Sequence, residues 1–129
     1  MEVAVYNDTG GTLAAGQVVY QTGIRYPSQL PTIALASAAT AATAAPMGIT
    51  VDAIADVTIG YIVITGNYYP MDTSAFAANA DAYLSDTPGA IATTAGTVES
   101  LVGSVTTASA SGTLDVSCQS TTSFVLSPL

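Results

Sequence analysis

The amino-acid sequence predicts an all-β fold, either a small antiparallel barrel or a β-tulip-like sandwich with long loops. Short runs of alternating apolar residues are separated by Gly, Pro, Asn and Asp, which is the pattern of strands and turns. The most regular run, residues 58–65, is rich in β-branched and aromatic side chains, which favour strands. Strands that follow one another this closely are typical of barrels and sandwiches.

In the first half of the chain, residues 3–6 form the first expected strand, in which valine alternates with Ala4 and Tyr6. The turn-forming residues 7–11 follow it. The stretch 36–45 is nearly all Ala, Ser and Thr without an apolar stripe, so a loop or an edge is expected there. The other strands expected in this half cover residues 17–21, 32–36 and 47–51, with a turn or a single helical turn at 52–56.

In the second half, the run 58–65 is the strongest strand, and residues 67–71 are expected to continue it past Gly66. A tight turn is expected at residues 86–89, because Pro88 presets φ and Gly89 accepts the positive φ of a type II turn. The remaining expected strands cover residues 82–85, 91–93, 101–106 and 113–118, the last two joined by a flexible segment.

The length of 129 residues predicts one domain. We assign residues 1–118 to the β-barrel or tulip-like domain and residues 119–129 to a C-terminal arm or tail. The tail is polar as far as Ser123 and then mainly apolar from Phe124 to Leu129. An apolar end of this kind either docks on a neighbouring protein or is disordered, and the sequence leaves both interpretations open.

Basic side chains are almost absent: Arg25 stands alone against nine acidic residues, histidine is missing, and the formal net charge is −8. Neutralising the phosphates of a nucleic acid, or docking on an anionic membrane, requires clustered Lys or Arg, so neither partner is expected. General bases, cationic clamps and zinc ligands are drawn largely from the same residue types. We therefore expect no enzyme, no cofactor and no metal site.

Half of the residues are nonetheless apolar, and alanine dominates them. Small side chains bury little area each, so a lone domain of this composition would be modestly stabilised. Coverage of part of the surface by another subunit would account for the composition, and an ordinary Ala/Thr-rich domain is the alternative. Residues 1–4 show no basic segment followed by an apolar stretch, so no signal peptide is expected.

Three motifs carry possible chemistry, and each has a simpler explanation. Asp8-Thr9-Gly10 matches the catalytic triplet of the dimeric aspartic proteases, in which two carboxylates share a proton, but its turn-rich surroundings favour a hairpin turn. Cys118, the single cysteine, is in phase with the apolar positions of its strand and is expected to be a buried, inert thiol. Two acidic pairs would suit Ca²⁺ if they met, yet they lack the spacing of a calcium loop, and capping or surface roles are preferred; the pairs are Asp52 with Asp56 and Asp72 with Asp81.

Five residues are candidate partner contacts. Arg25 is suited to an ion pair across an interface, with an ordinary surface residue as the preferred alternative. The run Tyr68-Tyr69-Pro70 suits a protein or glycan contact, with one core and one rim tyrosine as the alternative. Phe124 and Leu126 belong to the apolar end of the tail.

The order of short motifs along the chain resembles a family of small structural proteins of tailed bacteriophages, the capsid decoration (cement) and head-fibre-type proteins. The resemblance spans roughly residues 3–118 and is carried by turn and strand motifs in a shared order and spacing. These motifs are the opening run Val5-Tyr6-Asn7-Asp8-Thr9-Gly10-Gly11 through Tyr20, then Gly48-Ile49-Thr50, Ile54-Ala55, Gly60-Tyr61, Gly66, Asp72-Thr73-Ser74-Ala75-Phe76, Ala82-Tyr83-Leu84-Ser85, Gly103-Ser104-Val105 and Gly112-Thr113-Leu114.

The resemblance implies a compact β-barrel or tulip-like domain without catalytic residues. Such domains sit outside the phage head, commonly as trimers, and clamp adjoining major capsid subunits. This chain departs from the family in two ways: basic residues are missing from the expected strands and after the last of them, and the tail from Phe124 has no counterpart.

We therefore expect a virion protein on the outer surface of the capsid, made in the host cytoplasm, with the major capsid protein and copies of itself as partners. The alternative is a fibre- or tail-associated module that binds a host surface glycan, with Tyr68 and Tyr69 as the first residues to test.

Overall fold

The computed structural model describes residues 1–118, which form strands and one short 3-10 helix, so the predicted all-β class is confirmed. Within this part of the chain, no helix has the length and hydrophobicity needed to cross a membrane. The elements are β1 (Glu2–Asn7), β2 (Val18–Arg25), β3 (Leu30–Leu35), η1 (Ala41–Thr43), β4 (Gly48–Thr50), β5 (Thr58–Val63), β6 (Thr65–Met71), β7 (Asp81–Leu84), β8 (Ile91–Ala92), β9 (Leu101–Thr107) and β10 (Gly112–Ser117).

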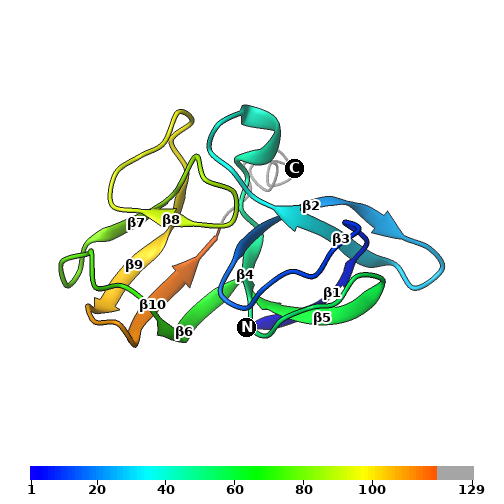
Figure 1. The fold of residues 1–129 in the computed structure, drawn as a ribbon, viewed down its shortest axis with the longest axis horizontal. Helices are drawn as coiled ribbons and strands as arrows, with labels where there is room; N and C mark the ends of the chain where they lie inside the picture. The colour runs from blue at the N-terminus through cyan, green and yellow to red at the C-terminus, as the bar shows by residue number, and fades with distance from the viewer. Residues whose placement is uncertain (119–129) are drawn as a thin grey trace, which may run out of the picture.

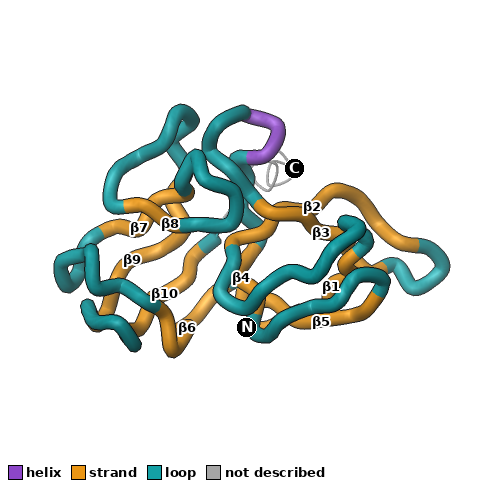
Figure 2. Tube along the Cα trace, viewed as in Figure 1, coloured by secondary structure: helices purple, strands orange, loops and turns teal. Residues whose placement is uncertain are grey.

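The strands form two halves that lie side by side (Figure 1). The first five strands close into a barrel in the order β1-β3-β2-β4-β5, and the others form an open sheet in the order β6-β10-β9-β7-β8. Within the barrel, β1 pairs with β3 in parallel, whereas its pairing with β5 is antiparallel. Long connections join the strands, as Figure 2 shows, and the Ala-rich stretch before β4 is one of them.

The chain passes from the barrel to the open sheet at Ile64, between β5 and β6. The expected single strand over residues 58–65 is therefore wrong, because β5 pairs with β1 and β4, whereas β6 pairs with β10. The strand expected at residues 67–71 is present, since β6 runs through Gly66 to Met71, but it is a separate strand from β5. The local sequence favours a strand on both sides of Ile64. Residues 58–71 are therefore divided into β5 and β6 only because the two parts pair with different strands.

Two apolar cores stabilise the molecule. One fills the barrel and contains Val5, Leu13, Val19, Ile33, Ile54 and Ile62. The other lies between the barrel wall and the open sheet; its larger members are Val18, Ile49, Val63, Tyr68, Leu84, Val102, Val105, Leu114 and Val116. Successive side chains of a strand point to opposite faces, so neighbouring residues of β2 and of β5 reach different cores. The wall that β2, β4 and β5 form is thus shared by both halves.

The tight turn before β8 follows the expected chemistry. Gly89 has a φ of 80°, and the backbone N–H of Ala90 donates to the carbonyl of Thr87 over 3.2 Å. Pro88 and Gly89 thus occupy the central positions of a type II turn with the roles predicted for them, and its four residues are 87–90, one position later than expected.

The carboxylate of Asp86 fastens the loop that follows β8. The backbone N–H and the hydroxyl of Thr97 donate to its two oxygens over 2.8 and 2.7 Å. These two bonds hold the pKa of Asp86 below its ordinary value, and the bond from the Thr97 hydroxyl has the larger effect. The unfolded chain lacks both donors, so the stabilisation is present above the unfolded pKa and is lost as pH falls through the lower, folded pKa.

We expect the hydrogen-exchange protection of the Thr97 amide to fall only at pH values below the ordinary pKa of an aspartate, as Asp86 becomes protonated. In Asp86→Asn the protection should be weaker at neutral pH and independent of pH in this range. Hydrogen exchange read by NMR at a series of pH values measures both. A Thr97 amide that stays equally protected in wild type and Asp86→Asn would contradict the role given to this carboxylate.

Candidate functional site

The outer side of the barrel carries an exposed apolar surface on β1 and β5. Tyr6 is paired with Ile59 in the register of these strands, and the next pair on the same side is Ala4 with Tyr61. Ile59 and Tyr61 remain 56% and 54% exposed, whereas the alternate residues face the barrel interior. We call Tyr6, Ile59, Tyr61 and the neighbouring Arg25 the β1–β5 face.

Arg25 lies over the ring of Tyr6, 4.2 Å from the ring centroid. This stacking orients the guanidinium on the aromatic face while leaving the side chain exposed. Tyr26, 75% exposed, follows in the connection between β2 and β3, which projects at the end of the barrel away from the open sheet (Figure 1). The only basic side chain of a strongly acidic chain therefore belongs to its exposed apolar face.

Val57, immediately before β5, is 65% exposed and has a φ of 54°. A positive φ is unfavourable for a β-branched residue, and glycine or asparagine would fit this position better. Its side chain is not needed for burial either. A strained, exposed valine next to the β1–β5 face marks this position as a further candidate contact.

The tyrosine pair does not form a joint surface. Tyr68 is buried, and its hydroxyl donates to the carbonyl of Thr50 over 3.0 Å, which ties the open sheet to the barrel. Burial, followed by the charge of Asp52, raises the pKa of Tyr68. Tyr68 is therefore not available to a partner, which corrects that prediction and leaves the arrangement of one core and one rim tyrosine.

The three predicted contact residues within residues 1–118 are thus not brought together. Tyr69 is 67% exposed but belongs to β6 in the open sheet, whereas Arg25 is the last residue of β2 in the barrel. The connection that follows β2 projects away from the open sheet (Figure 1). Phe124 and Leu126 lie outside the described residues. Of the three candidates that the structure describes, Arg25 alone belongs to the β1–β5 face.

The Asp-Thr-Gly triplet is part of a turn that Asn7 organises. Asn7 is fully buried; its Nδ2 donates to the carbonyls of Gly11 and Ile54, and its Oδ1 accepts from the backbone N–H and the hydroxyl of Thr9. Asp8 is exposed. The sequence predicted a hairpin turn at this point. That prediction is wrong, because the neighbours of β1 are β3 and β5 rather than β2.

One acidic residue of each pair considered for Ca²⁺ accepts hydrogen bonds within or next to a turn. Asp56 accepts a hydrogen bond from the backbone N–H of Gly10, and Asp72 accepts two from Ser74, which lower the pKa of Asp72. Within residues 1–118, no group of three or more His, Cys, Asp or Glu is placed to hold a metal ion. These carboxylates stabilise turns, which is the surface role preferred from the sequence.

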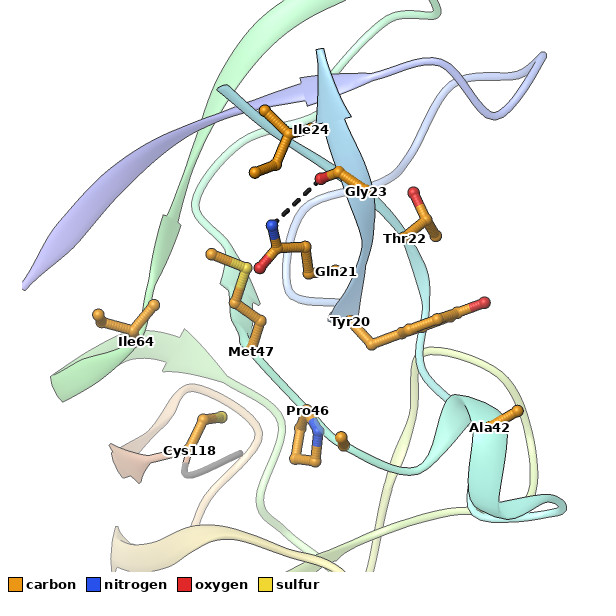
Figure 3. A pocket seen from close by; sticks show the side chains of 11 residues that line it. Tyr20, Gln21, Thr22, Gly23, Ile24, Ala42, Pro46, Met47, Ile64 and Cys118 are labelled. Atoms are coloured by element: carbon orange, nitrogen blue, oxygen red, sulfur yellow. Dashed lines mark hydrogen bonds between the residues drawn. The ribbon is translucent and has the colours of Figure 1, made fainter. Parts of the chain in front are cut away.

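Cys118 lies in the wall of a groove at the junction of the two halves. The groove runs past β2 and the segment that precedes β4, and Met47, Ile64 and Pro46 contribute to its lining (Figure 3). Burial raises the pKa of Cys118 to about 12, so the thiolate is scarce at neutral pH. This environment suits an inert thiol.

Sequence reasoning missed Tyr6, Ile59 and Tyr61. The run from Thr58 to Thr65 is apolar on both of its faces, which was the available signal that a second apolar surface exists. Burial of Val63 by the open sheet, while Tyr61 stays exposed, depends on packing between distant parts of the chain.

In chemical terms, the β1–β5 face offers aromatic and aliphatic area with one oriented cation, which suits non-covalent protein contact. The groove offers a second apolar surface at the junction. No protein-family model, no curated protein and no solved structure matches the chain.

Proposed function

We propose that this chain is a virion structural protein that binds the outer surface of a tailed-phage capsid and stabilises it by bridging major capsid subunits. The order of motifs across residues 3–118 supports the proposal. The observation that carries it is the β1–β5 face, an exposed apolar surface on a domain whose own cores are already filled. Exposed apolar patches of this kind mark protein interaction sites.

The composition of the face suits a binding site that depends on a few residues. Tyrosine and arginine are enriched among the residues that dominate the energy of protein interfaces. Tyr6 and Tyr61 provide large, rigid side chains, and Arg25 is already oriented by the ring of Tyr6. One cation per copy can meet one carboxylate of a capsid subunit, so most of the attachment rests on apolar contact.

The proposed mechanism is mechanical and needs no chemistry. A protein that binds only the assembled capsid lattice stabilises that lattice by mass action, by about 2.7 kcal/mol per site when its free concentration is 100 times its Kd. We propose a trimer, because simultaneous attachment of several copies adds avidity. The added interfaces would resist the internal pressure of packaged DNA.

Binding to capsid particles that lack the protein tests the proposal. We expect Tyr61→Ser to weaken binding at least tenfold, about 1.4 kcal/mol, because it removes a central aromatic contact. Tyr69→Ser is the matched control, since Tyr69 is similarly exposed but belongs to the open sheet. The control should bind within about threefold of wild type. Sedimentation of particles with labelled protein gives both affinities.

Two results would contradict the proposal. One is equal binding of wild type, Tyr61→Ser and Tyr69→Ser. The other is equal resistance to heat and osmotic shock in particles with and without the protein. The glycan-binding alternative has lost support, because only one tyrosine of its expected pair is exposed.

A further inference from the structure

The groove beside Cys118 has a volume of about 630 Å³ and opens between β2 and the segment before β4. Ile24 lies toward one end and Cys118 toward the other, with Met47 and Ile64 between them (Figure 3). Of the residues that the structure describes, none with a charged side chain lines this groove. An occupant that brings a charge would therefore find no partner there, and an uncharged apolar segment is the chemistry that fits.

The groove also exposes an unpaired edge of β2. The short strand β4 pairs only with Val18 and Val19, so from Tyr20 onward β2 has no strand partner on that side within residues 1–118. At this edge the side-chain amide of Gln21 donates to the carbonyl of Gly23 over 3.1 Å (Figure 3). A free strand edge next to an apolar groove is a common binding site for an extended peptide segment.

The segment best placed to occupy the groove begins where Cys118 ends. Residues 119–129 carry no charged side chain, and after a polar stretch of five residues they present Phe124-Val125-Leu126. Phe124 lies six positions after Cys118, and six residue steps of extended chain reach about 20 Å. Because Cys118 is itself part of the groove wall, this reach allows the apolar residues to contact the groove of their own chain.

We propose that the groove binds Phe124 to Leu126 of the same chain as an added extended segment along the free edge of β2. The short tether gives the segment an effective concentration in the millimolar range, so even weak intrinsic affinity fills the groove. This proposal is independent of the proposed capsid function.

The single cysteine of the chain reports on this contact. In the full-length protein, a seated segment shields Cys118 from iodoacetamide. We expect the double variant Phe124→Ser/Leu126→Ser to be alkylated at least about fivefold faster at constant pH, because the tethered segment no longer fills the groove. Ile24→Ser, which alters the groove wall, should also accelerate alkylation. Mass spectrometry follows the rate.

Leu101→Ser is the matched control, since Leu101 is 45% exposed on β9 and does not line the groove; it should react like wild type. Circular dichroism before alkylation verifies that each variant is folded. A second measurement uses NMR: the methyl resonances of Ile24, Met47 and Ile64 should shift in the double variant. Unchanged alkylation together with unchanged methyl resonances overturns the proposal. Protection of Cys118 that increases with protein concentration also overturns it, because the segment would then come from another copy.

Discussion

Replacing Asn7 by alanine is expected to destabilise the fold by about 3 kcal/mol, since its side chain makes four hydrogen bonds, each with a net contribution of roughly 0.5–1.5 kcal/mol. One of these bonds, to the carbonyl of Ile54, joins segments far apart in the sequence. Loss of the Asn7 side chain therefore loosens the end of the barrel as well as the turn. Equilibrium unfolding in urea measures the change.

Asp8→Ala provides the matched control at the adjacent position. Asp8 is exposed, so its removal should change the free energy of unfolding by less than about 0.5 kcal/mol. Asn7→Asp keeps the acceptor for Thr9 but turns a carboxylate oxygen toward the carbonyls of Gly11 and Ile54, and should be at least as destabilising as Asn7→Ala. A larger loss of stability in Asp8→Ala than in Asn7→Ala would contradict the role assigned to Asn7. Peptide cleavage that Asp8→Asn abolishes would instead revive the protease interpretation.

Leu114→Ala is expected to cost about 3 kcal/mol, within the range for fully buried leucines. Leu114 is completely buried in the core between the barrel wall and the open sheet. Because barrel residues such as Val18 and Val63 share this core, the two halves should unfold together. The variant should therefore lower the hydrogen-exchange protection of barrel amides, including that of Val5, as much as that of amides in β9 and β10.

Leu101→Ala is the control for this experiment, because it makes the same truncation at an exposed position of the neighbouring strand. Its cost should stay below about 1 kcal/mol. Protection lost only in the open sheet of Leu114→Ala would show that the halves unfold separately. That result would contradict a shared core as the source of cooperativity.

Sequence reasoning predicted those parts of the fold that depend on local chemistry. Proline and glycine at positions 88 and 89 define their turn without help from distant residues, and that prediction is confirmed. The division at Ile64 and the parallel pairing of β1 with β3 are different in kind, because both are choices among distant partners. An alternating pattern identifies a strand but does not name its neighbour.

The candidate site was less predictable for the same reason. The alternation of Tyr68 and Tyr69 indicated one buried and one exposed ring, but the direction of each follows from the pairing of β6 with β10. Arg25 was identified from its rarity alone. Its stacking on Tyr6 depends on two strands meeting in the folded barrel, and this contact is what connects it with Ile59 and Tyr61.

The wall shared by the two halves raises a problem of alignment between strands. Where β2, β4 and β5 meet, both faces are apolar, so side-chain polarity scarcely opposes a shift of one residue in pairing. Gly48 opposes such a shift, because a Cβ at this position would lie 2.6 Å from the carbonyl oxygen of Val63. A one-residue slip would bring Met47 or Ile49 to this point, and neither fits beside that carbonyl. The correct pairing register of β4 within the barrel thus depends on the missing side chain of Gly48.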